Sequence, residues 1–327
     1  MDTDSVIETI YSGPDAVFTL CINEQISTQY YYYCRQLPVA YQQDALRLRQ
    51  FDQEFKFLES ISDNQGILKG SWDNTSDGNP AIIYDYKNYS SIGKIVKDCV
   101  SAEQRIPLPL TIKWSISLIV ILEQLQAAAA ELEEPDIDIA IWPDTLFVDA
   151  SGNLHITHFS LNAPPSISSS IIKHNLTRYF LYSAPEQTIA GHTPDEKVLY
   201  FVLGMLLYEL LTSKPLFTTH TSIDSKQIVR RKLRKLHPLL SDVDSRLEPL
   251  NLIVTELLTP NPDNRLAHLT PVKNKLLEFQ QKLDINDNQA ETISFQNFKD
   301  MLTDSLERNP LLGRNFETSN INQFNAS

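Results

Sequence analysis

The sequence predicts an α+β protein of two lobes, a small β-rich N-terminal lobe and a larger helical C-terminal lobe, with a C-terminal amphipathic tail. Residues 7–37 alternate apolar and polar side chains in short runs, as half-buried strands do. Residues 110–132 form a long apolar stretch of helical length. Residues 284–327 are polar and rich in Asn, except for one segment with helical spacing of apolar residues. We therefore expect an N-lobe over 1–87, a C-lobe over 88–283 and the tail beyond.

The N-lobe is expected to combine a small sheet with one helix. Apolar residues recur at helical spacing between residues 42 and 60, which predicts that helix. Two more strands are predicted over 66–72 and 81–86, because the stretch between them is rich in Asp, Asn, Gly and Pro.

The C-lobe is expected to be mostly helical, with one hairpin. Residues 146–148 and 154–156 are apolar and flank the turn-forming stretch 149–153, which predicts the hairpin. Apolar spacing predicts helices in the following stretches: 110–132, 195–211, 226–237, 246–258 and 271–282.

Composition excludes several classes of function. The net charge of −13 makes nucleic acid and anionic membranes unfavourable partners. No two of the 9 glycines have the spacing G-x-G, so an intact dinucleotide fingerprint is excluded, and the P-loop pattern of two glycines five residues apart followed by Lys and Ser or Thr does not occur either. The three cysteines lie far apart and form no zinc-binding pattern.

We expect neither a secretion signal nor membrane insertion. The first five residues, Met-Asp-Thr-Asp-Ser, are acidic and lack the apolar region of a signal peptide. The most apolar window, 116–130, is short and interrupted by Glu and Gln, so we expect no transmembrane segment. A cytoplasmic protein is the expectation.

Three ordered stretches carry a resemblance to a known family. Residues 182–186 end in Ala-Pro-Glu, residues 198–217 form an apolar run with Gly204 and end in Pro-Leu-Phe, and residues 258–265 read Leu-Thr-Pro-Asn-Pro-Asp-Asn-Arg. In this order and spacing they resemble the segment after the activation loop of protein kinases. Over residues 10–283 the chain therefore resembles the protein-kinase fold.

The resemblance implies that the catalytic positions are altered. Phosphoryl transfer in this family needs a base, a phosphate-binding lysine and metal ligands. Anchored on Pro143, the alignment puts Ala140 at the base, Trp142 at the catalytic-loop lysine and Thr145 at the metal-binding asparagine. His158 replaces the aspartate of the Asp-Phe-Gly motif, which should hold Mg²⁺.

The nucleotide-binding positions of the N-lobe are altered in part. Gly13 is the one glycine kept of the phosphate loop, and Arg35 replaces the lysine of the third strand. Glu54 lies at the glutamate that pairs with that lysine, so Arg35 and Glu54 either form an ion pair or remain two separate solvated side chains. The resemblance also implies a buried ion pair between Glu186 and Arg265.

Retained packing residues with altered catalytic residues are what a pseudokinase looks like. We therefore predict a protein that is not an enzyme, has no cofactor and binds another protein as a scaffold or allosteric regulator. Two alternatives remain open at this stage. One is a nucleotide sensor that binds without metal through Arg35, and the other is a weakly active atypical kinase or transferase.

Two surfaces are candidates for partner binding. One is a cationic helix face within the basic run 226–235, which either docks an acidic partner or is simply solvated. Its candidate residues are Arg230, Arg231 and Arg234. The other is the apolar face of the tail helix, which either packs on the C-lobe or enters a groove of another protein. Its candidate residues are Phe295, Phe298 and Leu302.

Overall fold

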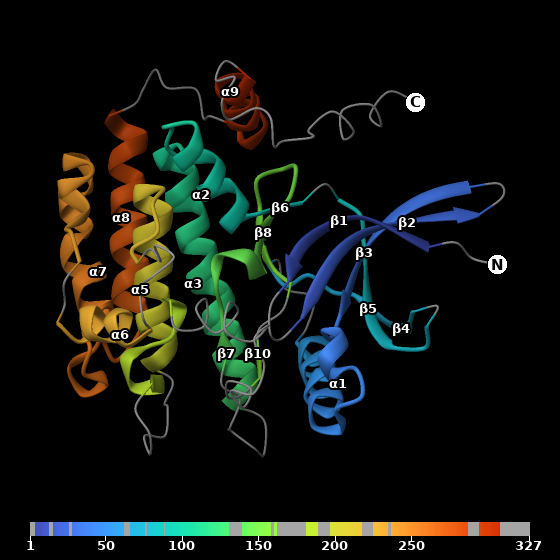
Figure 1. Ribbon diagram of the computed structural model, residues 1–327. Helices are drawn as coiled ribbons and strands as arrows, with labels where there is room; N and C mark the ends of the chain where they lie inside the picture. Colours follow the sequence, from blue (N-terminus) through green and yellow to red (C-terminus); the bar gives the residue numbers. More distant parts are fainter. Residues whose placement is uncertain are drawn as a thin grey trace.

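The computed structural model places a β-sheet and one helix beside a larger helical part (Figure 1). The residues that it describes are 4–12, 16–25, 28–61, 66–75, 77–87, 89–130, 139–157, 160–161, 181–188, 197–217, 225–234, 237–286 and 294–307. The predicted α+β architecture with a β-rich N-terminal and a helical C-terminal part is confirmed.

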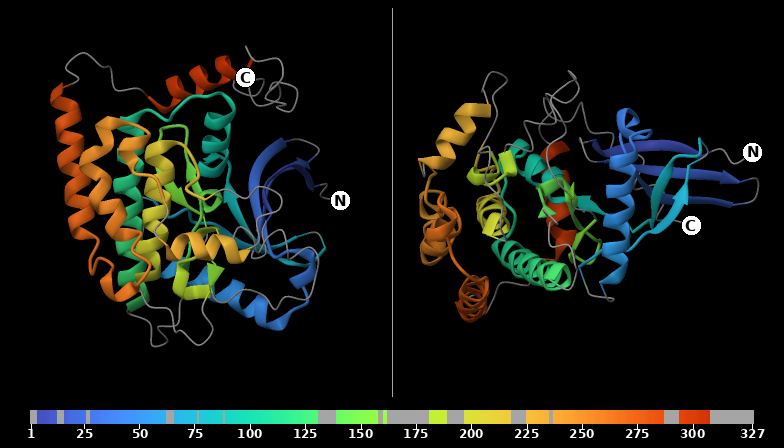
Figure 2. Two further views of the ribbon diagram at one scale, coloured as in Figure 1. Left: turned by 60° about the vertical axis from the view of Figure 1, so that its left-hand side comes forward. Right: turned by 90° about the horizontal axis from the view of Figure 1, so that it is seen from below.

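The N-terminal sheet is antiparallel and has the strand order β1-β2-β3-β5-β4. Its strands are β1 (Asp4–Ser12), β2 (Val17–Gln25), β3 (Thr28–Gln36), β4 (Ser71–Asn74) and β5 (Pro80–Asp85). Helix α1 (Ala45–Ser60) begins after Asp44, whose carboxylate accepts hydrogen bonds from the Leu46 and Arg47 amides. Seen from below, α1 lies between the sheet and the helical part (Figure 2).

The strand predicted over 66–72 is displaced in the structure. Strand β4 begins only at Ser71, whereas residues 66–68 pair with the hairpin of the C-terminal part. The Leu68 amide donates to Ile156 O at 2.9 Å, and the Ile156 amide donates to Gly66 O at 2.8 Å. The buried side chains of Ile67 and Leu68 explain the apolar pattern that resembled a longer strand.

The C-terminal part holds the helices α2 (Ile92–Ser101), α3 (Leu108–Ala130), α5 (Lys197–Thr212), α6 (Ser225–Leu233), α7 (Asn251–Leu257), α8 (Thr270–Asn286) and α9 (Phe295–Glu307). The predicted hairpin is confirmed as β8 (Leu146–Val148) and β9 (Leu154–Ile156), with β6 (Ser90–Ser91) beside β8. Strands β7 (Ile139–Ala140) and β10 (Ser160–Leu161) form a second small pair. The short 3₁₀ helices are η1 (Val39–Tyr41), η2 (Pro143–Thr145), η3 (Pro185–Thr188), η4 (Leu240–Asp242), η5 (Ser245–Leu250) and η6 (Pro262–Asn264).

The structure of the C-terminal part differs from the prediction in two places. The single helix expected over 246–258 is split into η5 and α7. Pro249 lies inside η5, where it lacks an amide hydrogen for an α-helical bond. Helix α2 was not predicted, although its buried residues Ile92, Ile95, Val96 and Cys99 follow helical spacing.

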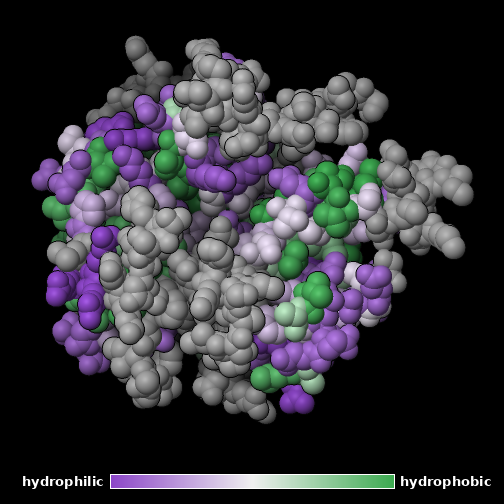
Figure 3. Space-filling model, in the orientation of Figure 1, coloured by the Kyte–Doolittle hydropathy of each residue, from purple (hydrophilic) through white to green (hydrophobic). Residues whose placement is uncertain are grey.

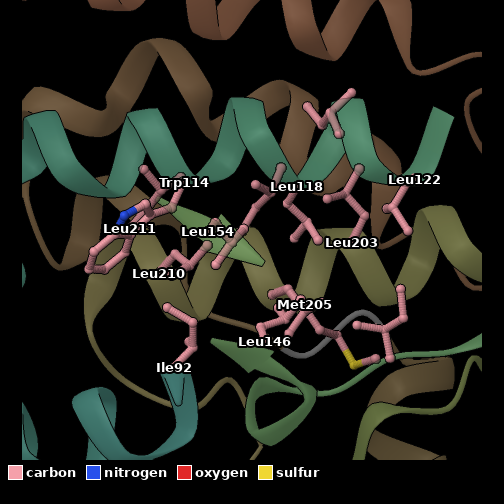
Figure 4. Packing of buried hydrophobic residues seen from close by; sticks show 14 of the residues in the cluster. Ile92, Trp114, Leu118, Leu122, Leu146, Leu154, Leu203, Met205, Leu210 and Leu211 are labelled. Atoms are coloured by element: carbon pink, nitrogen blue, oxygen red, sulfur yellow. The ribbon is translucent and has the colours of Figure 1, made fainter. Parts of the chain in front are cut away.

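The core of the C-terminal part lies between α3 and α5. Figure 4 shows Trp114, Leu118 and Leu122 of α3 directed at α5, which contributes Leu203 and Leu210. Among the described helices, α3 alone has the length and composition to cross a membrane, and it is longer than the apolar window 116–130. Eleven of its side chains are buried, so here it serves as the central helix of a packed core.

The face of the molecule in Figure 3 gathers hydrophobic residues over the sheet. The exposed apolar side chains of the sheet include Val6 and Ile7 on β1 and Tyr30 on β3.

The hydrophobic cluster around α3 and α5 also contains buried residues of the N-terminal part, among them Phe57, Leu58 and Ile61. The apolar core of the helical part therefore continues into α1, whereas most of the buried sheet residues form a second cluster that includes Trp142 and Phe147.

Candidate functional site

Arg35 and Glu54 form a buried ion pair between β3 and α1. Arg35 Nη2 lies 2.5 Å from Glu54 Oε2, and the two residues are 1% and 4% exposed. The Arg35 guanidinium also lies over the Phe51 ring, 5.1 Å from its centroid. Of the two alternatives from the sequence, the ion pair is the one present.

Tyr84 interacts with Arg35 of this ion pair and ties β5 to the C-terminal part. It is 2% exposed, and its hydroxyl donates to Thr157 O at 3.2 Å. Burial is the main cause that raises the pKa of Tyr84 to about 12, against a smaller opposing effect of Arg35. The hydroxyl is therefore neutral, and it bonds the carbonyl directly before the position of His158.

An aromatic cluster fills the space between β1, β2 and the catalytic-loop equivalent. Tyr11 and Trp142 have ring centroids 6.1 Å apart, and the fully buried Phe18 lies 5.7 Å from Tyr84 and 5.2 Å from Phe147. Ala16, at a phosphate-loop glycine position, is also fully buried. The region where the sequence places nucleotide-binding positions is thus packed with side chains.

The positions aligned with catalytic residues are occupied by groups that hold the local backbone. Thr145 is fully buried, and its hydroxyl donates to Trp142 O at 2.9 Å. The backbone of Ala140 pairs with Ser160 in the β7–β10 ladder. His158 and Gly13 lie outside the described residues. Among the residues that the structure does describe, no group of three or more His, Cys, Asp or Glu side chains could hold a metal ion.

Glu186 and Arg265 form the second buried ion pair that was predicted. Arg265 Nη1 and Nη2 donate to the two Glu186 carboxylate oxygens at 2.6 and 3.0 Å. The same guanidinium donates to the Thr259, Pro260 and Lys197 carbonyls. This pair therefore joins the Ala-Pro-Glu segment to the turn before α8 and to the start of α5.

Lys232 is a structural residue that the sequence analysis assigned to a basic surface. It is 2% exposed, and its ammonium donates to Leu181 O at 2.8 Å and Ser183 O at 2.6 Å. Burial lowers its pKa well below the usual value, and Glu186 opposes this effect. Its spacing of four residues from the buried Ile228 was the available signal that it faces inward.

Three other cations of the basic run face solvent. Arg230, Arg231 and Arg234 are exposed near the C-terminal end of α6, with Leu233 48% exposed among them. The tail candidates lie elsewhere and are not exposed: Phe295 and Phe298 are each 2% exposed and Leu302 is 7% exposed. The structure thus shows the tail helix packed on its own chain, and α6 as the exposed candidate.

Comparison with solved structures identifies the fold. No protein-family model matches the chain. A variant of the Mycobacterium tuberculosis PknI kinase domain superposes with a TM-score of 0.57 at 15% identity, covering 85% of this chain and 96% of that one. Another variant of the same domain gives a TM-score of 0.59 with 86% and 97% coverage. The chain has a protein-kinase-like fold.

Sequence comparison adds relatives that are themselves protein kinases. Aurora kinase A-B of Xenopus laevis is 32% identical over 128 residues, which is 38% of this chain and 28% of that protein. An Aurora kinase of Patiria pectinifera is 33% identical over 129 residues, 39% of this chain and 29% of that protein. The chain therefore spans less than a third of the length of these curated relatives.

Proposed function

We propose that this protein is a pseudokinase that transfers no phosphate and acts by binding another protein. The observation that carries the proposal is the packing around Arg35. Arg35 is 1% exposed, and its guanidinium is bound to Glu54 and interacts with Tyr84, whose hydroxyl donates to Thr157 O. A phosphate group would have to break this packing before it could reach the Arg35 guanidinium, the cation at the aligned lysine position.

The residues at the catalytic positions support the same proposal. An alanine at position 140 has no group that accepts a proton, and the Thr145 hydroxyl is already bonded to Trp142 O. Mg²⁺ prefers carboxylate and other oxygen ligands, which the imidazole of His158 does not supply. Phosphoryl transfer depends on positioning and metal ions, so the loss of both removes its chemical basis.

The two alternative functions have weaker support. A metal-independent nucleotide sensor would use Arg35 for a bidentate phosphate contact, but Arg35 is engaged with Glu54 and buried. A weakly active kinase or transferase would still need a phosphate cradle, and the aromatic rings of Tyr11, Phe18 and Trp142 fill that region.

A thermal-shift experiment with ATP distinguishes the three functions. We expect no change in Tm with ATP alone, with Mg²⁺ or with Mn²⁺, because saturation to 100 times a Kd would add about 2.7 kcal/mol to the free energy of unfolding. A shift with ATP alone would indicate the sensor. A metal-dependent shift, with transfer of labelled phosphate to a generic acceptor, would indicate the kinase.

For the partner we propose an acidic protein surface that contacts α6. The three exposed guanidinium groups form a local cationic face on a chain with net charge −13, and such a field attracts acidic partners. Leu233 adds exposed apolar area within that face.

Charge reversal tests this surface. The variant Arg230→Glu/Arg231→Glu/Arg234→Glu should lose the partners that wild type recovers from native extract, and their recovery by wild type should fall as salt rises. The matched control reverses three exposed charges elsewhere, Arg49, Lys56 and Lys87. Equal recovery by wild type and both variants would exclude α6 as the interaction surface.

A further inference from the structure

Helix α9 lies on a defined site formed by α2, α3 and the β8–β9 turn. In Figure 1, and in the left-hand view of Figure 2, α9 crosses the end of the molecule beside α2, away from its predecessor α8. Its buried side chains Phe295, Phe298 and Leu302 join the same hydrophobic cluster as α3. We call the surface made by Trp114, Gly152 and α2 the α9 docking site.

The site fits Phe295 closely. The rings of Phe295 and Trp114 meet edge to face with centroids 5.8 Å apart, and Trp114 Nε1 donates to Gly152 O at 3.1 Å. A Cβ atom at Gly152 would lie 2.9 Å from the Phe295 Cβ, closer than side chains tolerate. Gly152 also has φ +76°, a conformation that favours glycine. The turn therefore leaves room for the Phe295 side chain.

Helix α9 depends on this site for its own stability. It is a 13-residue helix, and isolated helices of this length are marginal in water. Its opposite face is polar or exposed, with Gln296, Asn297 and Asp300 in solvent and Met301 54% exposed. Among the described residues, α9 is therefore held in place by one apolar stripe, which consists of Phe295, Phe298 and Leu302.

The docked position also brings two cations together. Burial, and then the neighbouring Lys94, lower the pKa of Lys299, whose ammonium lies over the Phe295 ring. Lys94 belongs to α2 and pairs with Glu8 of β1 at 3.8 Å. Burial and the like charge of Lys94 both disfavour the charged form of Lys299, and Asp300 opposes this effect, so the docked position carries an electrostatic cost beside its apolar contacts.

We propose that Trp114, Gly152 and α2 form a helix-binding site, and that α9 is its reversibly bound ligand. The recognised pattern is Phe-x-x-Phe-x-x-x-Leu, as in residues 295–302. The proposal does not depend on whether the protein transfers phosphate, because the site lies apart from the Arg35 region and involves none of its residues.

Hydrogen exchange on the full-length wild-type protein tests reversibility without any substitution. Amides of α9 should exchange together through an opening that leaves α3 protected, and amides of α2 and of 149–153 should be the next to lose protection. Exchange of α9 at the same rate as the core amides of α3 would overturn the proposal.

A peptide competition experiment tests the site itself. A fluorescent peptide of residues 294–307 is titrated against the full-length variant Phe295→Ala/Phe298→Ala, whose own helix lacks both anchors, and against wild type. The vacated variant should bind the peptide at least tenfold more tightly than wild type, in which α9 occupies the site. A Met301→Ala protein should behave like wild type, and a peptide with both Phe changed to Ala should not bind. Equal binding by the two proteins, or no binding by the vacated variant, would overturn the proposal.

Discussion

The buried charges of this protein differ in how they are compensated. Arg265 faces Glu186, and Lys232 faces two backbone carbonyls. Asp98 of α2 is different. The residue is buried, with 9% of its surface exposed, yet its Oδ1 accepts no hydrogen bond from the described residues. Removing the partner of a compensated charge should therefore destabilise the protein. Neutralising an uncompensated charge should instead stabilise it.

Glu186→Ala should lower the free energy of unfolding by about 3–5 kcal/mol, because it leaves the buried Arg265 guanidinium without its carboxylate. Chemical denaturation of wild type, this variant and the exposed-site control Glu248→Ala measures the difference. The structural role of the pair would be refuted by a Glu186→Ala protein as stable as the control.

Asp98→Asn should stabilise the protein at neutral pH. Burial raises the pKa of Asp98 from 3.8 to about 6, with Lys94 and Lys97 opposing weakly. Between these pH values the folded state holds more protons than the unfolded state, so the ionisation of Asp98 lowers stability as pH rises. The variant should gain up to about 3 kcal/mol at pH 7.5 and nothing at pH 3. A gain that is the same at both pH values would contradict this explanation.

At the scale of elements, close helix packing depends on single small residues. Helices α5 and α7 meet at Gly204, where a Cβ atom would lie 2.9 Å from the Leu257 Cβ and 3.0 Å from the Leu258 Cγ. These are branched side chains already buried in the core, so they have little room to move.

Gly204→Val should destabilise the protein by about 1–3 kcal/mol, because overpacking forces α5 and α7 apart. The loss should outweigh the higher helix propensity of valine over glycine. The control is Gly78→Asn, at a turn with φ +77° where nothing lies within 4 Å and where Asn tolerates the backbone. If Gly204→Val left the thermal stability unchanged, α5 and α7 would be able to move apart without any loss of stability.

At the scale of the whole molecule, both large apolar clusters cross from the N-terminal part into the helical part, and the one that holds most of the buried sheet residues includes Trp142 and Phe147. Phe57, Leu58, Ile61 and Ile67 share one cluster with the residues of α3 and α5. Tyr84 and Thr157 add a hydrogen bond between the two parts. A chain of 327 residues need not unfold in one step. Because these contacts cross between the two parts, we expect the two parts of this protein to unfold together.

We expect calorimetry to show one thermal transition whose calorimetric and van't Hoff enthalpies agree. Ile67→Ala, which removes an apolar side chain at the junction, should lower Tm or split the transition. Exposed Leu46→Ala serves as the control. Two separate transitions in the wild type would indicate that the sheet side and the helical part unfold independently.

The sequence by itself determined the kind of elements and their order. The hairpin around 149–153 follows from local turn chemistry, and the Glu186–Arg265 pair follows from the ordered stretches that resemble protein kinases. Both are predictable because a short-range pattern, or the order and spacing of a few short segments, carries the information. Helix α2 has a readable pattern as well, so its omission was an error of interpretation.

Only the tertiary structure decided which way several side chains face. Lys232 belongs to a basic run in the sequence, but the carbonyls of Leu181 and Ser183, about fifty residues away, draw it inward. Residues 66–68 look like part of a sheet strand, but they pair with β9. Phe295 and Phe298 form an apolar face that suits either a partner or the chain itself, and the room left at Gly152 decides for the chain. In each case the deciding contact joins residues far apart in sequence, so a local pattern can indicate that a side chain faces inward but does not identify its partner.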